Sequence, residues 1–112
     1  MAIKTPTTSR LSDRCLRVTW TDLRNGDVGV GVPGLSDCSV QVFGDFGLGG
    51  EAVIQGSNDS GGAFSALHDR QGFAVVMGDA GIRGIAEFVE LIRPAVSGDD
   101  TTSLTVTLIA KG

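Results

Sequence analysis

The chain has 112 residues, which is enough for one hydrophobic core and too few for two independent ones. Hydrophobic residues make up 41% and charged residues 20%, which excludes the highly charged, weakly apolar composition of disordered chains. The formal net charge of −4 argues against a nucleic-acid-binding protein, because such a protein needs a positive surface.

The sequence contains no apolar run near the roughly 18 to 20 residues that span a bilayer. The first residues, MAIKTPTTSRLSDR, also lack the apolar centre of a secretory signal. We therefore expect synthesis in a cytoplasm and no membrane partner. Cys15 and Cys38 are not in a metal-binding spacing, and in that compartment we favour reduced, buried thiols over a disulfide.

Residues 1–13 are rich in Thr and Ser, contain Pro6 and show no apolar periodicity. They predict an extended N-terminal arm ahead of a single β-sandwich domain over residues 14–112. Such an arm is free to contact a neighbour. The candidate partner contacts on it are Lys4, Thr5, Pro6, Thr7, Thr8 and Arg10.

Alternating apolar and polar residues predict half-buried strands over residues 15–21, 38–43 and 104–110. Trp20 shares a strand face with Leu16 and Val18, which favours a place in the core. Between the first two strands, the glycine-rich segment 25–34 lacks G-x-G-x-x-G between a strand and a helix, so it predicts a connection or an irregular edge strand.

Glycine accounts for 17 residues, about twice the usual share of roughly 7%. Many of these glycines fall in segments that favour turns. The predicted turns and polar loops are residues 44–50, 56–62, 69–72 and 97–102.

Residues 52–55 and 63–67 flank the turn at 56–62 and predict a hairpin. Residues 73–77 are continuously apolar, which predicts a strand covered on both sides. Residues 81–94 fit either a helix or a strand, with a short helical turn near 80–86 as one alternative. Pro94 favours an extended backbone at the end of that segment.

Seven or eight short strands with regular turn signals predict an all-β fold, an antiparallel β-sandwich or jelly roll. Helical bundles and α/β folds do not fit this pattern.

The residues that could carry chemistry are few and scattered. His68, the single histidine, has only Asp69 beside it in the sequence and is expected in an exposed turn. Asn58 with Asp59, and Asp99 with Asp100, offer oxygen ligands for calcium but lack the D-x-D-x-D-G register, so a turn role is favoured. We predict no catalytic, metal-binding or cofactor-binding residue, and no enzyme.

Glu51, Glu87 and Glu90 are the acidic residues weighed for glycoside hydrolysis, and they are expected at exposed strand positions.

Two stretches resemble the galactose-binding-like jelly rolls. Val53-Ile54-Gln55-Gly56-Ser57-Asn58-Asp59, followed by Phe64 and Leu67, is similar to a hairpin common in that family, and Ile92-Arg93-Pro94 with Val96 is similar to a later strand. The chain departs from the pattern at Ser60, where glycine is usual, and at Phe64, where tryptophan is frequent.

The second half of the chain, from Gly56-Ser-Asn-Asp to Leu108, resembles small virion proteins of tailed bacteriophages that are encoded beside the major capsid protein. The resemblance implies a head decoration or cement protein on the capsid surface. Its implied partners are the major capsid protein and further copies of itself, as a homotrimer.

Two alternatives remain open. A carbohydrate-binding or adhesion module of a phage or cell surface would be favoured by an exposed Trp20 beside a polar pocket. A tail or connector component would be favoured by ring formation in solution.

Overall fold

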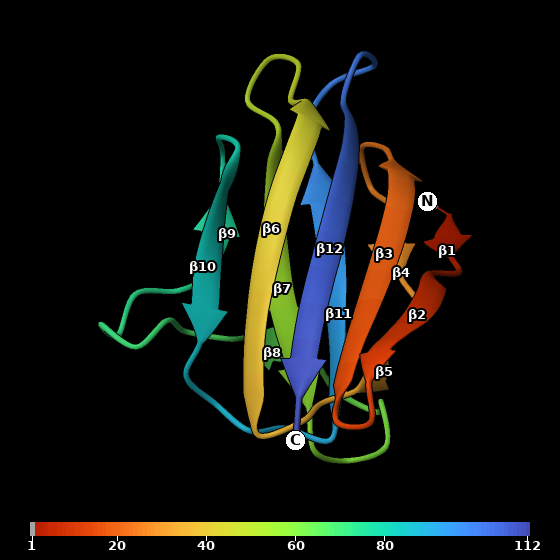
Figure 1. Cartoon of the computed structure of the whole chain (residues 1–112). Helices are drawn as coiled ribbons and strands as arrows, with labels where there is room; N and C mark the ends of the chain where they lie inside the picture. The colour runs from red at the N-terminus through yellow and green to blue at the C-terminus, as the bar shows by residue number, and fades with distance from the viewer. Residues whose placement is uncertain (1) are drawn as a thin grey trace.

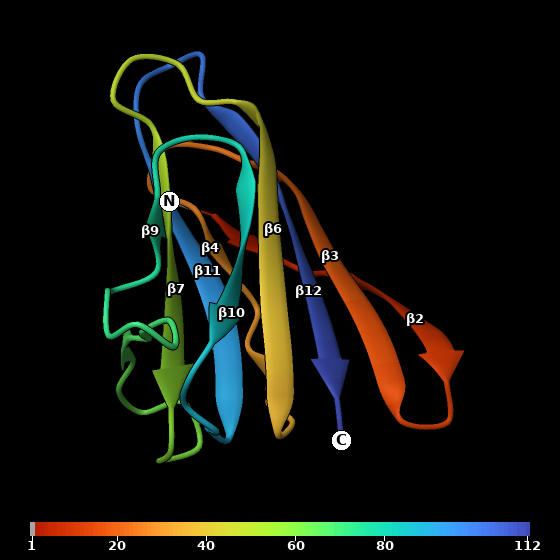
Figure 2. The same cartoon turned by 60° about the vertical axis from the view of Figure 1, so that its left-hand side comes forward.

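The computed structural model describes residues 2–112 as an all-β fold of two facing sheets (Figures 1 and 2). The prediction of an all-β sandwich is confirmed. The first six strands are β1 (Ile3–Lys4), β2 (Thr7–Ser12), β3 (Cys15–Leu23), β4 (Val28–Gly29), β5 (Val32–Pro33) and β6 (Asp37–Asp45). The remaining six are β7 (Glu51–Ser57), β8 (Ser65–Ala66), β9 (Val76–Met77), β10 (Gly81–Ile85), β11 (Leu91–Ser97) and β12 (Ser103–Lys111).

One layer is a five-stranded antiparallel sheet in the order β10-β6-β12-β3-β2. Its three long strands contain the three segments whose alternation predicted them. The inward residues of β12, Leu104, Val106, Leu108 and Ala110, are all buried.

The other layer is a seven-stranded sheet in the order β1-β4-β11-β7-β8, with β5 also paired to β11 and β9 to β7. The glycine-rich segment 25–34 supplies β4 and β5, which run irregularly along β11. The expectation of a connection or an irregular edge strand holds for β5, which pairs only with β11, but β4 lies inside the sheet between β1 and β11. Gly29 is needed there, because a Cβ at this position would lie 2.5 Å from Trp20 Nε1.

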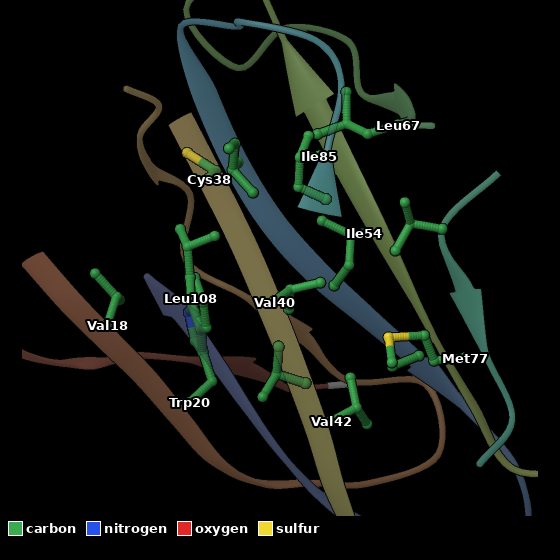
Figure 3. Packing of buried hydrophobic residues seen from close by; sticks show 14 of the residues in the cluster. Val18, Trp20, Cys38, Val40, Val42, Ile54, Leu67, Met77, Ile85 and Leu108 are labelled. Atoms are coloured by element: carbon green, nitrogen blue, oxygen red, sulfur yellow. The ribbon is translucent and has the colours of Figure 1, made fainter. Parts of the chain in front are cut away.

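The core lies between the sheets, and Figure 3 shows side chains from both layers meeting there. Trp20 is only 1% exposed, as its strand pattern predicted. Its Nε1 donates a hydrogen bond to the carbonyl oxygen of Val30 at 3.1 Å, which ties β3 of one sheet to the chain between β4 and β5 of the other.

The N-terminal segment is extended, as expected, but it does not stand apart from the domain. β1 pairs in parallel with β4, and β2 forms the edge of the five-stranded sheet beside β3. Asp27 helps to hold the segment, because its carboxylate accepts a hydrogen bond from the backbone N–H of Ala2 at 3.0 Å. Met1 lies outside the described residues.

Two further expectations are corrected. The segment 73–77 is not covered on both sides, because β9 lies at an edge of its sheet, where Phe73 is 66% exposed while Val75 and Met77 point inward. The alternative of a helical turn near 80–86 is wrong, since 81–85 pairs with β6 as β10. The extended backbone expected before Pro94 is confirmed by β11.

Cys15 and Cys38 are free thiols, as favoured from the sequence, although Cys15 is only half-buried. In residues 2–112 no helix is long and apolar enough to cross a membrane.

Candidate functional site

An apolar row crosses the outer surface of the seven-stranded sheet. Strand register places Ile3 beside Val28, Val28 beside Ala95, Ala95 beside Val53, and Val53 beside Val76. We call these five residues the apolar row. It runs straight across β1, β4, β11, β7 and β9.

The row points away from the core, because the residues next to Val53, Val76 and Ala95 on their strands point inward. Ala52, Met77 and Val96 are all 5% exposed or less. The two ends of the row are open to solvent: Ile3 is 66% exposed and Val76 is 39% exposed. A contiguous apolar patch of this kind is typical of a surface that binds another protein.

Arg93 and Gln55 form the next row of the same face. Arg93 Nε donates a hydrogen bond to Gln55 Oε1 at 2.9 Å, and the Arg93 guanidinium lies 3.8 Å from the centre of the Phe64 ring. Phe64 therefore holds the charge flat against the sheet.

The outer surface of the five-stranded sheet has the opposite character. Its central rows, read across the sheet, are Ile82, Gln41, Thr107, Thr19 and Thr7, and Gly84, Ser39, Ile109, Arg17 and Ser9. The hydroxyls of Thr19 and Thr107 lie 3.4 Å apart. The exposed large apolar side chains of this sheet lie toward its edges: Phe43 and Ile82 near β10, and Leu11 on β2.

The predicted contact residues of the N-terminal segment do not form one patch. Lys4 belongs to β1, where its Nζ lies 3.6 Å from Asp27 and 3.9 Å from Asp22. Thr7, Thr8 and Arg10 lie on the exposed edge strand β2. Thr5 and Pro6 connect β1 to β2.

Sequence reasoning missed the apolar row, because its members come from five separate strands and only the pairing brings them together. The available signal was weak. Val53 and Ala95 stand at the outward positions of strands whose inward positions are also apolar, so neither strand alternates cleanly between polar and apolar residues.

His68 is exposed, as expected, and it pairs with Glu87. The two side chains meet at 2.8 Å, and the backbone N–H of His68 donates to the same carboxylate at 2.7 Å. Burial acts to raise the pKa of Glu87, but the hydrogen bonds from His68 outweigh it and lower that pKa. The pair links the chain after β8 to the chain after β10.

The two acidic loops weighed for calcium are built as turns. Asp59 accepts hydrogen bonds from Ser57 Oγ at 2.7 Å and from the backbone N–H of Ala63 at 2.9 Å. Asp99 accepts bonds from Thr101 and Leu48, which lower its pKa to about 2. Within residues 2–112 no group of three or more His, Cys, Asp or Glu side chains could hold a metal ion.

An open hollow of about 390 Å³ lies beside the hairpin of β7 and β8. Most of the polar side chains that line it are already engaged: Ser57 with Asp59, Glu87 with His68, and Asn58 with the backbone N–H of Glu90 at 2.9 Å. Of the acidic residues weighed for hydrolysis, Glu87 and Glu90 lie outside strands, while Glu51 begins β7.

Comparison with known proteins yields a structural likeness only. The sequence matches no protein-family model and no curated protein. Among solved structures, the fold is similar to a cupin domain from Bordetella pertussis Tohama I, with a TM-score of 0.53 and 11% identity over 96% of this chain and 91% of that one. At such low identity the likeness shows a cupin-like jelly-roll fold and nothing about activity.

Proposed function

We propose that this protein is a non-enzymatic virion structural protein, a head decoration or cement protein that binds the outer surface of the major capsid protein shell. The observation that carries the proposal is the contrast between the two outer faces. One sheet presents the apolar row across five strands, and the other presents mainly Thr, Ser and Gln over its central strands, with Phe43 and Ile82 exposed near its β10 edge. A module that attaches by one face and leaves the other in water needs such a contrast.

The resemblance of residues 56–108 to small virion proteins of tailed bacteriophages supplies the identity of the partner. It also agrees with how the chain uses its polar groups. Asp59, Asp69 and Asp99 all accept backbone hydrogen bonds in turns. Their role is to shape loops, which suits a protein that acts by presenting a surface.

Shell binding does not require a strong single contact. A capsid repeats the same site many times, and linked copies bind with an avidity that exceeds the affinity of each one. In this proposal the apolar row supplies the main contact with the shell. The edge strand β2, which carries Thr7, Thr8 and Arg10, lies beside that contact in the virion and is not the main contact.

The carbohydrate-binding alternative has one observation in its favour, the hollow beside the β7 and β8 hairpin. The exposed tryptophan that it needs is not provided by Trp20, which is 1% exposed. Stacking on a sugar ring would have to come from another side chain.

The test is a binding assay of the purified protein on expanded phage heads that lack decoration, with a glycan array run on the same sample. Saturable, symmetric occupancy of the heads with a blank array is the expected result. A specific glycan signal with bare heads would overturn the proposal in favour of the carbohydrate-binding alternative. Rings in solution that leave the heads bare would favour the tail or connector role.

A further inference from the structure

The turn between β3 and β4 contains the pair Asn25-Gly26. The chain has two asparagines, and the other, Asn58, is followed by Asp59. Asn25 and Gly26 are both exposed, and Gly26 has a φ of 86°, a conformation that glycine adopts without steric cost. A glycine after asparagine leaves the next backbone nitrogen accessible to the asparagine side chain. Asn25 is therefore the asparagine of this chain that is chemically more prone to lose its side-chain amide.

Loss of this amide proceeds through the backbone. The Gly26 nitrogen gives up its proton to solvent base and attacks Cγ of Asn25. The new C–N bond closes a succinimide ring, and the side-chain nitrogen leaves as ammonia. Water then opens the ring at either carbonyl. One product is aspartate, and the other is isoaspartate, in which the main chain runs through the side-chain carboxyl carbon and is longer by a methylene group.

The fold holds both reacting groups in hydrogen bonds. The Gly26 N–H donates to the carbonyl of Val96 on β11 at 2.8 Å, so the attacking nitrogen keeps its proton. Asn25 Oδ1 accepts the backbone N–H of Gly98 at 3.0 Å, which fixes the side chain on the loop after β11. The Val96 N–H in turn donates to the carbonyl of Asp27 at 2.9 Å. Cyclisation therefore requires the turn to come away from β11.

The same turn holds the N-terminal segment. The buried Asp27 carboxylate accepts the backbone N–H of Arg24 at 2.9 Å and that of Ala2 at 3.0 Å. Lys4 Nζ lies 3.6 Å from the same carboxylate. β4, the partner strand of β1, begins at the next residue, Val28. A longer backbone between Arg24 and Asp27 would shift all of these contacts out of register.

We propose that Asn25 is a latent deamidation site. It is closed while the turn is held on β11 and reacts when the turn comes away, and its isoaspartyl product releases the N-terminal segment from β4. Local openings of this kind require less free energy than global unfolding. Ile3 and Val28 of the apolar row lie on the two strands that would separate, so a modified chain would also bind a shell more weakly. Only this last consequence rests on the proposed function.

Peptide mapping by mass spectrometry measures the modification at each asparagine. In the full chain unfolded in urea, Asn25 should deamidate and Asn58 should do so more slowly, because the Asp59 side chain hinders ring closure. In the folded chain the rate at Asn25 should be at least tenfold lower than in urea. Asn25→Gln is the matched control, since it keeps an amide oxygen for the Gly98 N–H but would have to close a larger ring, and it should stay unmodified. Equal rates at Asn25 in folded and unfolded chains would overturn the proposal.

Hydrogen exchange at the Gly26 N–H tests the opening itself. This hydrogen exchanges with solvent when its bond to the Val96 carbonyl is broken, which is the same event that frees the nitrogen to attack. Exchange should therefore be slowed, relative to an unstructured peptide, by the same factor as deamidation, to within a factor of roughly three. Unprotected exchange at Gly26 together with slow deamidation would contradict the role of the Val96 bond.

The isoaspartyl chain tests the effect on the N-terminal segment. It is obtained by deamidation in urea, separated by ion-exchange chromatography and refolded, and it should keep the circular dichroism of the unmodified chain. Trypsin should cleave it after Lys4 and Arg10 at least tenfold faster than the unmodified chain. Asn25→Asp is the control, because it carries the same charge on a backbone of normal length, and it should resist trypsin as the unmodified chain does.

Three results with trypsin and circular dichroism would overturn the proposal: a modified chain that loses its whole fold, a modified chain as resistant as the unmodified one, or an Asn25→Asp variant that is equally sensitive. None of these measurements uses phage heads, so they are independent of whether the proposed function holds.

Discussion

Val53 on β7 and Ala95 on β11 face each other across an antiparallel pair at the middle of the apolar row. The core residue Ala52 lies next to Val53 on β7, and the core residue Val96 lies next to Ala95 on β11. Ala52 and Val96 also pair with each other across the two strands. At this row the two strands at the centre of the sheet therefore carry apolar side chains on both faces, while Glu51, Gln55, Arg93 and Ser97 occupy neighbouring outward positions. Such strands are usual where both faces are covered, which is why we assign this face to a partner.

Gly29 is predicted to be intolerant of any side chain. A Cβ there would lie 2.5 Å from Trp20 Nε1 and 2.6 Å from Pro94 Cδ. Gly29→Ala should lower the free energy of unfolding by roughly 1–3 kcal/mol, as overpacking does elsewhere. Urea unfolding followed by the fluorescence of Trp20 measures this. The matched control is Gly78→Ala, whose nearest contact would be 3.9 Å away; equal effects at both positions would contradict the packing described.

Trp20→Phe is predicted to loosen the link between the sheets. The substitution removes the donor to the Val30 carbonyl and leaves space beside Gly29. The Val30 carbonyl then lacks its donor, which should lower the free energy of unfolding by roughly 1–3 kcal/mol. Calorimetry is the suitable measurement, since the variant has no tryptophan. An unchanged melting temperature would show that the bond to Val30 contributes nothing.

Asp99 is predicted to make the protein sensitive to acid. Hydrogen bonds from Thr101 and Leu48 lower its pKa from 3.8 to about 2. A carboxyl with a lowered pKa in the folded state contributes stability that is present above the unfolded-state pKa and is lost as pH falls through the folded-state pKa. Stability should therefore decline between about pH 4 and pH 2, and less steeply in Asp99→Asn. Asp100→Asn should keep the slope of the unmodified chain; a reversed order would contradict this assignment.

The two cysteines are predicted to differ in reactivity. Burial raises the pKa of the Cys38 thiol, and its side chain is 3% exposed. Since the thiolate is the reactive form, a thiol reagent should label the half-buried Cys15 first and Cys38 only on unfolding. Mass spectrometry of the labelled peptides distinguishes the two sites. Early labelling of Cys38 would contradict its burial.

The sequence allowed prediction of the strands that alternate, and less of the rest. In β12 the period of two is unbroken, and in β3 it holds as far as Trp20, because one face of their sheet meets water. Both strands and their buried faces were therefore predictable, apart from the irregularity that buries Leu23 at the end of β3. The prediction that the segment 73–77 is covered on both sides was wrong, because a continuous run of apolar residues also fits an edge strand with an exposed Phe73. The pairing of β1 with β4 joins residues about 25 positions apart, so no local pattern indicated it. The β2–β3 hairpin is local, but β2 has no apolar alternation that would have predicted it as a strand.

The apolar row was beyond prediction because strand register assembles it from five strands, as when Val53 on β7 meets Ala95 on β11. Local patterns indicate which residues lie in a strand. They do not indicate which strand ends or outward positions become neighbours.

The central claim is that the apolar row attaches this protein to a capsid shell. The most direct test compares Val53→Glu with Thr107→Glu, which place the same charge on opposite outer faces, in a binding titration on decoration-free heads. Both variants should unfold at midpoints close to that of the unmodified protein. We predict at least a tenfold loss of head affinity for Val53→Glu, about 1.4 kcal/mol, and unchanged affinity for Thr107→Glu. Unchanged binding of folded Val53→Glu, or an equal loss for Thr107→Glu, would contradict the claim.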